Sequence, residues 1–255
     1  MHNITAIGFD LFNTLITVET RTLAVAIERL IQSLRESGIN LEEESFKSAY
    51  RNAAMKLIKS AREDGRETHN SLWISAALEE EGDPIPPDDS RIGAAVENYF
   101  SAFYDNVHPI PGTGAMLDTL KEKYALGLLS NFTHGPAARE ILKRTGLTAY
   151  FETILISGEL GYRKPHPLVF RRLAEELDAN ENQMLYIGDD LTPDIWGAHR
   201  AGLQPIWMTY VRDNKIPLVP GMIQNDQKEP DFEVPRISIW QDLLSLLEEM
   251  EAKPA

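Results

Sequence analysis

The chain has 255 residues, with 39 acidic against 25 basic side chains and a formal net charge of −14 at pH 7. This acidic balance argues against nucleic acid as a partner, because binding to a phosphate backbone needs a clustered positive surface. No cysteine is present, which excludes disulfides and thiolate metal sites.

The first predicted element is a short apolar strand at 4–9, which ends at Asp10. Four further apolar runs of strand length follow along the chain, at 124–130, 151–157, 184–190 and 204–210. Helical patterns lie between or after them, at 112–122, 136–144, 167–177 and 194–201. Apolar strands alternating with helices predict a parallel sheet that is covered on both faces. Because crossovers are right-handed, we expect an α/β core with a Rossmann-like, doubly wound parallel sheet.

One interval, 17–107, interrupts the alternation and is too long for an ordinary loop. Apolar residues recur in it at helical spacing in three stripes: Leu23, Ile27, Leu30, Ile31 and Leu34; Phe46, Tyr50, Ala53, Leu57 and Ala61; Ile92, Val96, Tyr99, Phe100 and Phe103. We therefore predict an inserted α-helical cap over 17–107 and a core formed by 1–16 and 108–255. A final amphipathic helix is expected at 240–250.

Polar side chains follow the predicted strands at the edge where open α/β sheets bind ligands. These residues are Asp10, Ser130, Asn131, Lys164, Asp189, Asp190 and Asp194. Each has a plain structural alternative, as a turn residue, a helix cap or a solvated lysine. Three carboxylates within six residues repel one another unless a cation neutralises them, and hard oxygen ligands suit Mg²⁺.

The order of these residues resembles that of the haloacid dehalogenase-like hydrolase superfamily. Four stretches fit its motifs: FDLFNTL (9–15), LLSN (128–131), KPHPLVF (164–170) and YIGDDLTPDIWGAHRAG (186–202). The resemblance covers nearly the whole chain, and the insertion at 17–107 is similar to the family's cap between the first and second motifs.

The resemblance implies catalytic roles for three residues. Asp10 matches the nucleophile, Ser130 the residue that binds the transferring group, and Lys164 the lysine that stabilises the developing charge. Substrate binding is then expected from Asn13, Thr14, Ser130, Asn131 and Lys164. The metal ligands implied for Mg²⁺ are Asp10, the backbone carbonyl of Phe12 and Asp189, with Asp194 beside them or linked through water.

Phe12 departs from the pattern of the family's phosphatases, which carry a second Asp two residues after the nucleophile. That Asp protonates the leaving group and then activates water, and a phenyl ring does neither. General acid–base help is worth roughly a hundred- to ten-thousandfold in rate. By sequence position, Asp190, Asp194, His134 and His166 are candidates to replace it, and Phe12→Asp is expected to raise phosphatase activity.

Three functions remain open at this point. The first is a Mg²⁺-dependent phosphatase acting on a small phosphorylated metabolite through an aspartyl-phosphate. The second is a 2-haloacid dehalogenase, a class with an aromatic residue at this position whose halide leaving group needs no proton. The third is a catalytically weak binding or regulatory protein. The acidic residues near 189 favour the first function, because the family's dehalogenases work without metal.

The remaining expectations concern partners and location. The substrate is expected to be a small phosphate ester, and the protein a monomer or homodimer with no nucleic-acid or membrane partner. The first residues, MHNITAIGFD, contain no basic stretch followed by an apolar run, and no apolar stretch reaches membrane-spanning length. A cytoplasmic protein is therefore expected.

Overall fold

The computed structural model describes residues 4–217 and 229–252, and its centre is a six-stranded parallel sheet. The strands are β1 (Ala6–Phe9), β4 (Ala125–Ser130), β5 (Thr153–Ile156), β6 (Met184–Gly188), β7 (Gln204–Met208) and β8 (Arg236–Ile237). Their order is β5-β4-β1-β6-β7-β8, and every neighbouring pair runs parallel. The chain winds outward from β1 in both directions, which confirms the predicted doubly wound, Rossmann-like class.

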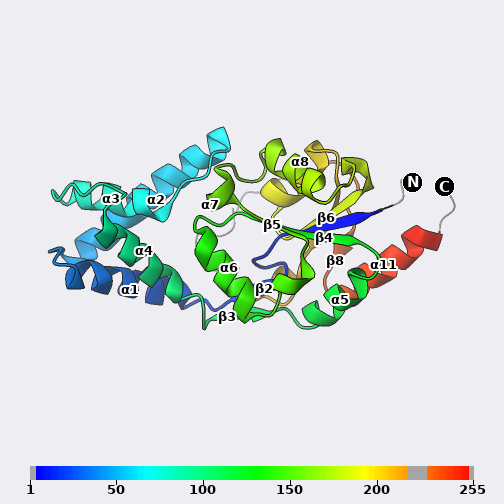
Figure 1. Cartoon of the computed structure of the whole chain (residues 1–255), viewed down its shortest axis with the longest axis horizontal. Coiled ribbons are helices and arrows are strands. Elements are labelled where there is room, and N and C mark those ends of the chain that lie inside the picture. Colours follow the sequence, from blue (N-terminus) through cyan, green and yellow to red (C-terminus); the bar gives the residue numbers. More distant parts are fainter. Residues whose placement is uncertain (1–3, 218–228, 253–255) are drawn as a thin grey trace.

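Helices cover both faces of the sheet (Figure 1). Helices α5 (Thr113–Leu120), α6 (Gly135–Arg144) and α11 (Trp240–Ala252) pack on the face to which Ile7 and Phe9 point. Helices α8 (Pro167–Glu176) and α9 (Gly197–Arg200) pack on the opposite face, which contains Ala6. The period of two along β1 thus separates two hydrophobic clusters. A Cβ at Gly8 would lie 2.6 Å from Leu173 Cδ2, so glycine permits α8 to pack closely on β1.

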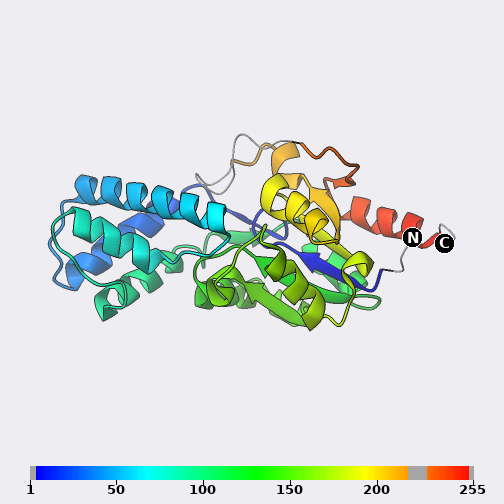
Figure 2. The same ribbon diagram turned by 90° about the horizontal axis from the view of Figure 1, so that it is seen from above.

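Four helices form an insertion beside this core, as Figures 1 and 2 show. They are α1 (Thr22–Glu36), α2 (Glu43–Asp64), α3 (Asn70–Glu80) and α4 (Ser90–Ser101). Helix α1 packs along α4, and α2 packs along α3. Each presents a buried stripe at helical spacing, such as Leu30, Ile31 and Leu34 in α1. Side-chain oxygens cap two of them, because Glu42 accepts from Ser45 N–H and Asp89 accepts from Arg91 N–H.

Two short strands at the ends of this insertion were missing from the sequence prediction. Strand β2 (Ile16–Val18) pairs antiparallel with β3 (Val107–Pro109). Each has three residues, too few to show a period, so only their pairing across the insertion identifies them. The pairing of β2 with β3 brings the two ends of the helical insertion together where they join the core.

The predicted helix at 194–201 also differs in detail. A π-helical turn (Leu191–Trp196) precedes α9, and the carbonyl of Asp190 accepts from both Asp194 N–H and Ile195 N–H. Single π turns are frequent at functional sites. The remaining short elements are η1 (Thr148–Tyr150), α7 (Ser157–Leu160), η2 (Glu181–Gln183) and α10 (Tyr210–Asp213). Among the described helices, none combines the length and apolar character that crossing a bilayer requires.

Candidate active site

Asp10 lies directly after β1, at the carboxyl edge of the sheet. Its backbone N–H donates to the carbonyl of Ile187 at 2.9 Å, which continues the pairing of β1 with β6. The side chain is buried, with 7% of the residue exposed. Its two oxygens have different partners, because Oδ1 accepts from Lys164 Nζ at 2.6 Å and Oδ2 accepts from Thr14 Oγ1 at 3.2 Å. The carboxylate is therefore held in one orientation.

Lys164 lies in the loop between α7 and α8, and it is buried, with 2% of the residue exposed. Nζ donates to Asp10, to Asp194 Oδ1 at 2.6 Å and to the hydroxyl of Tyr186 at 2.9 Å. The side chain of Asn131 fixes the backbone of the same residue, because Oδ1 accepts from Lys164 N–H at 2.8 Å and Nδ2 donates to Lys164 O at 2.9 Å. Burial opposes the charge on Lys164, yet the two carboxylates raise its pKa well above the usual value.

Three carboxylates gather around this lysine. Asp10, Asp189 and Asp194 each offer an oxygen within 4.8 Å of the others. The three carboxylates carry three negative charges and the Lys164 ammonium carries one positive charge. Together these groups have a formal charge of −2. Burial raises the pKa of Asp189 well above its usual range, and repulsion from Asp10, Asp194 and Asp190 adds to the shift. The chemistry of this donor set fits a divalent cation of the Mg²⁺ type, which prefers hard oxygen ligands.

The protonation of these carboxylates predicts a pH dependence of metal binding. Burial raises the pKa of Asp10 to about 6, and repulsion from Asp194 offsets part of the attraction of Lys164. Because the pKa of Asp10 is higher in the folded than in the unfolded protein, ionisation of Asp10 destabilises the metal-free fold. The contribution of protonated Asp10 to stability is therefore complete below pH 3.8 and is lost as the pH rises through about 6. A metal ligand must be ionised, so cation binding has the opposite dependence. We expect Mg²⁺ to bind at least about tenfold more weakly near pH 5 than near pH 7. Calorimetric titration at both pH values measures this, and equal affinities would contradict it.

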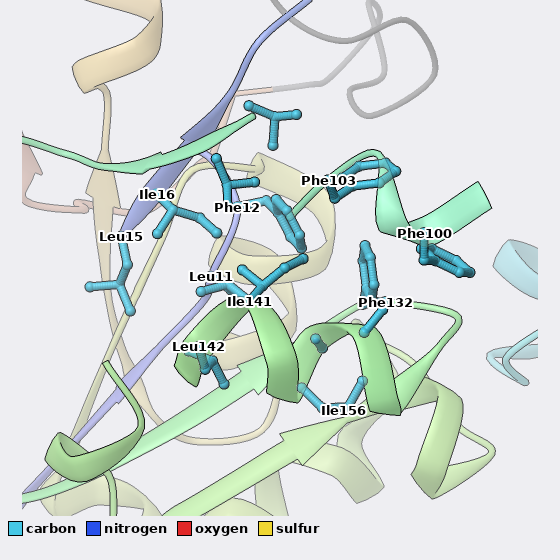
Figure 3. Close-up of a cluster of buried hydrophobic side chains, with 14 of the residues drawn as sticks. Leu11, Phe12, Leu15, Ile16, Phe100, Phe103, Phe132, Ile141, Leu142 and Ile156 are labelled. Carbon is cyan, nitrogen blue, oxygen red and sulfur yellow. The ribbon is translucent and has the colours of Figure 1, made fainter. Parts of the chain in front are cut away.

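Phe12 lies in an aromatic cluster that joins the core to the insertion (Figure 3). Its ring stacks on Phe132 with centroids 4.9 Å apart and planes 21° apart. Phe132 in turn contacts Phe100 of α4 at 5.1 Å and Phe103 at 6.0 Å. All four rings are buried. We call these four residues the aromatic cluster. The side chain that departs from the motif is therefore part of the joint between the two parts of the chain.

A polar contact adjoins this cluster, made by the loop between α2 and α3. The buried carboxylate of Glu67 accepts from Ser157 Oγ at 2.5 Å and from Arg163 Nη1 at 3.2 Å. Its backbone N–H donates to the carbonyl of Gly161, and Arg163 N–H donates to the carbonyl of Gly65, both at 3.0 Å. The insertion thus contacts the segment that carries Lys164.

The candidates for a replacement acid or base are mostly engaged in other contacts. His134 Nε2 lies 2.9 Å from Glu97 Oε1, and its ring stacks on Phe100. His166 caps α8 by accepting from Leu168 N–H at 3.2 Å. Asp194 accepts from Lys164 and from Asp190 N–H. Asp190 is half-buried beside Asp189 and also interacts with other groups, so these contacts do not single out a replacement.

The remaining predicted substrate-binding residues lie around Asp10, and their roles remain predictions. Ser130 ends β4 and is buried. Asn13 adopts a left-handed conformation with φ 60, and its backbone N–H donates to Ile16 O at 2.7 Å. That N–H is therefore engaged within the loop, and the amide of Asn131 likewise holds Lys164. The sequence prediction also missed Tyr186. A tyrosine within the otherwise apolar run MLYIG is a usable signal, because a buried hydroxyl needs a hydrogen-bond partner.

A doubly wound parallel sheet with a buried aspartate–lysine–aspartate group at its carboxyl edge defines the class: an α/β, Rossmann-like core with inserted helices. A family model described as haloacid dehalogenase-like hydrolase matches residues 4–202. The chain belongs to this family and is an enzyme of the hydrolase class.

Curated relatives and solved structures agree with this assignment. The chain is 30% identical over 207 residues to a ribulose-1,5-bisphosphate 5-phosphatase of Halopiger xanaduensis, covering 79% of this chain and 83% of the relative. It is 27% identical over 208 residues to a glyceraldehyde 3-phosphate phosphatase of Pyrococcus abyssi, covering 81% and 82%.

The similar solved structures support the fold. A 2-haloacid dehalogenase from Pseudomonas syringae has a TM-score of 0.69 at 21% identity, with coverage of 97% of this chain and 99% of that one. A magnesium-bound hydrolase of the same family from Bacillus subtilis has a TM-score of 0.62 at 23% identity, covering 96% and 99%.

Proposed function

We propose that the protein is a Mg²⁺-dependent phosphatase that hydrolyses a small phosphate ester through an aspartyl-phosphate on Asp10. The main observation is the cluster of Asp10, Asp189 and Asp194 beside Lys164. Asp10 and Asp194 are buried, Asp189 is half-buried, and the cluster's formal charge of −2 favours a bound cation. Two curated relatives are named as phosphatases of small phosphorylated compounds, which supports the same class of substrate.

In the proposed reaction a carboxylate oxygen of Asp10 attacks phosphorus, and the bond from phosphorus to the ester oxygen breaks. The departing oxygen takes a proton from a neighbouring acid or from water. Thr14 and Lys164 hold the Asp10 carboxylate in place, and the lysine opposes the charge that develops on the phosphoryl oxygens. Ser130 and Asn131 help to bind the phosphoryl group. Water then attacks phosphorus and releases phosphate and free Asp10.

Asp10, the backbone carbonyl of Phe12, Asp189 and Asp194 would hold Mg²⁺. When bound, the ion supplies charge neutralisation for the phosphoryl group and the nucleophile. We further propose that residues 17–107 act as a cap over a core of 1–16 and 108–255. The aromatic cluster and Glu67 connect these two parts, and a cap that closes in this way excludes water from the reacting groups.

One observation favours a second function, that of a 2-haloacid dehalogenase. Phe12 supplies no proton, and a halide leaving group needs none. The acidic group counts against this alternative, because in a metal-free site Lys164 alone opposes the charges of Asp10, Asp189 and Asp194.

An activity test separates the two functions. We expect hydrolysis of p-nitrophenyl phosphate that depends on added Mg²⁺, stops with EDTA and returns with excess Mg²⁺. We expect Asp189→Asn to weaken Mg²⁺ binding and to lower this activity at least about a hundredfold. The reason is that proteins hold Mg²⁺ through only one or two carboxylates, and Asp189 would be one of them. The exposed Asp105→Asn is the matched control. Metal-independent chloride release from 2-chloropropionate, with no phosphate ester turned over, would identify a dehalogenase instead.

A further inference from the structure

Tyr186 makes the third contact of the Lys164 ammonium group. A lysine ammonium has three hydrogen-bond donors, and three acceptors surround Nζ: Asp10 Oδ1, Asp194 Oδ1 and the Tyr186 hydroxyl. The first two are carboxylates of the acidic group, while the third is a neutral oxygen on β6. Tyr186 is completely buried, with 0% of its surface exposed. All three donors therefore have acceptors within hydrogen-bonding distance.

The hydroxyl of Tyr186 has its own fixed orientation. It donates to the carbonyl of Leu129 at 2.9 Å, so its lone pairs are directed toward Lys164. Leu129 precedes Ser130, the residue expected to bind the phosphoryl group. The ring is wedged edge-on against Phe170 of α8, with centroids 5.1 Å apart and planes 82° apart. The hydroxyl is thus a rigid point that connects β6, β4 and the lysine.

From this geometry we infer that Tyr186 is a positioning residue, whose hydroxyl holds the Lys164 ammonium group between Asp10 and Asp194. Without this third acceptor, one ammonium proton has no partner in a buried site, and the lysine can rotate toward either carboxylate. The charge that opposes the developing negative charge is then less well placed. The Tyr186 hydroxyl is hydrogen-bonded to Lys164 and to the carbonyl of Leu129, so its effect on Asp10 passes through Lys164. The kinetic part of this inference rests on the proposed phosphatase function.

The first test needs no substitution and no substrate. In the protein labelled with ¹⁵N at lysine, a buried ammonium group with three acceptors exchanges its protons slowly and gives a ¹H–¹⁵N signal. We expect that signal for Lys164, with nuclear Overhauser contacts from the ammonium protons to the ring protons of Tyr186. If the Lys164 signal shows no contact with the Tyr186 ring, the inference is wrong.

The second test removes the hydroxyl alone. In Tyr186→Phe we expect the Lys164 ammonium signal to shift or broaden, and kcat for p-nitrophenyl phosphate to fall about tenfold to a hundredfold. KM is expected to change less than about twofold, since the phosphoryl-binding groups remain. The matched control is Tyr124→Phe, which removes another buried tyrosine's hydrogen bond, to Glu251 at 2.8 Å, at the opposite edge of the sheet. It is expected to leave both readouts unchanged.

The outcomes separate this inference from the proposed function. If the wild-type protein hydrolyses no phosphate ester, the proposed function fails, while the Lys164 signal still decides the role of Tyr186. If the wild-type protein is active and Tyr186→Phe leaves kcat and the signal as they were, the inference is overturned. It is equally overturned if Tyr186→Phe and Tyr124→Phe lower kcat by the same factor, because a general loss of stability then explains both.

Discussion

Asp10→Asn is expected to reduce hydrolysis of p-nitrophenyl phosphate by roughly ten-thousandfold or more while the protein remains folded. Replacing a nucleophile removes the covalent route and leaves only the help of the surrounding groups. The structural cost is small, because Lys164 keeps its contacts with Asp194 and Tyr186. Burial of the Asp10 charge is itself unfavourable, as the rise of its pKa to about 6 indicates. At neutral pH the metal-free variant is therefore expected to melt no lower than the wild-type protein.

Activity, thermal unfolding and chemical trapping together check this expectation. Acid quenching during turnover should capture a phosphoryl group on Asp10 in the wild-type protein and none in the variant. The control Asp105→Asn changes an exposed carboxylate that contacts Arg144, and is expected to retain full activity. Activity of Asp10→Asn within about tenfold of the wild type would contradict a covalent role for Asp10, provided that mass spectrometry shows the introduced amide has not reverted to a carboxylate.

Phe12→Asp is expected to destabilise the protein by about 3 to 5 kcal/mol, and not to raise its phosphatase activity. The motif by itself predicts a gain, because it restores an acid at the position where the family's phosphatases carry one. In the structure, however, Phe12 is 8% exposed and stacked on Phe132. Removing a buried phenyl ring costs about 3 to 5 kcal/mol, and a carboxylate in its place adds a desolvation penalty.

Thermal unfolding and the Mg²⁺-dependent activity of Phe12→Asp measure these effects. A loss of this size lowers the melting temperature by roughly 10 °C in a protein of this length. Phe12→Leu serves as the matched control, because it keeps an apolar side chain in the aromatic cluster and is expected to cost about 1 kcal/mol. A Phe12→Asp protein that is as stable as the wild type and more active would show that position 12 serves the substrate and not the joint.

Position 12 shows which features of the site a motif predicts and which depend on contacts between distant residues. The motif identifies the position as that of the missing acid–base group, and the sequence offers four replacements. The structure engages His134 with Glu97, His166 with the start of α8, and Asp194 with Lys164. These contacts join residues separated by 37 positions in the first case and 30 in the third. No local pattern predicts such pairings.

The fold was predictable because its signals are local. Each apolar run of strand length, and each helical stripe between the runs, depends on a few consecutive residues. Parallel strands joined by right-handed crossovers then place their carboxyl ends at one edge. Local patterns therefore predicted the doubly wound sheet, the helical insertion, and the approach of Asp10 to Asp189 and Asp194. The place of Lys164 beside them was implied by the resemblance of the motifs to the family.

Other features were decided only when distant segments met in space. The pairing of β2 with β3, the hold of Asn131 on the Lys164 backbone, and the contact of Tyr186 with Lys164 all belong to this group. The burial of Phe12 against Phe132 and Phe100 does too. Side-chain contacts of this kind depend on packing and orientation across the whole molecule, whereas a sequence pattern reports only which face of its own element a residue occupies.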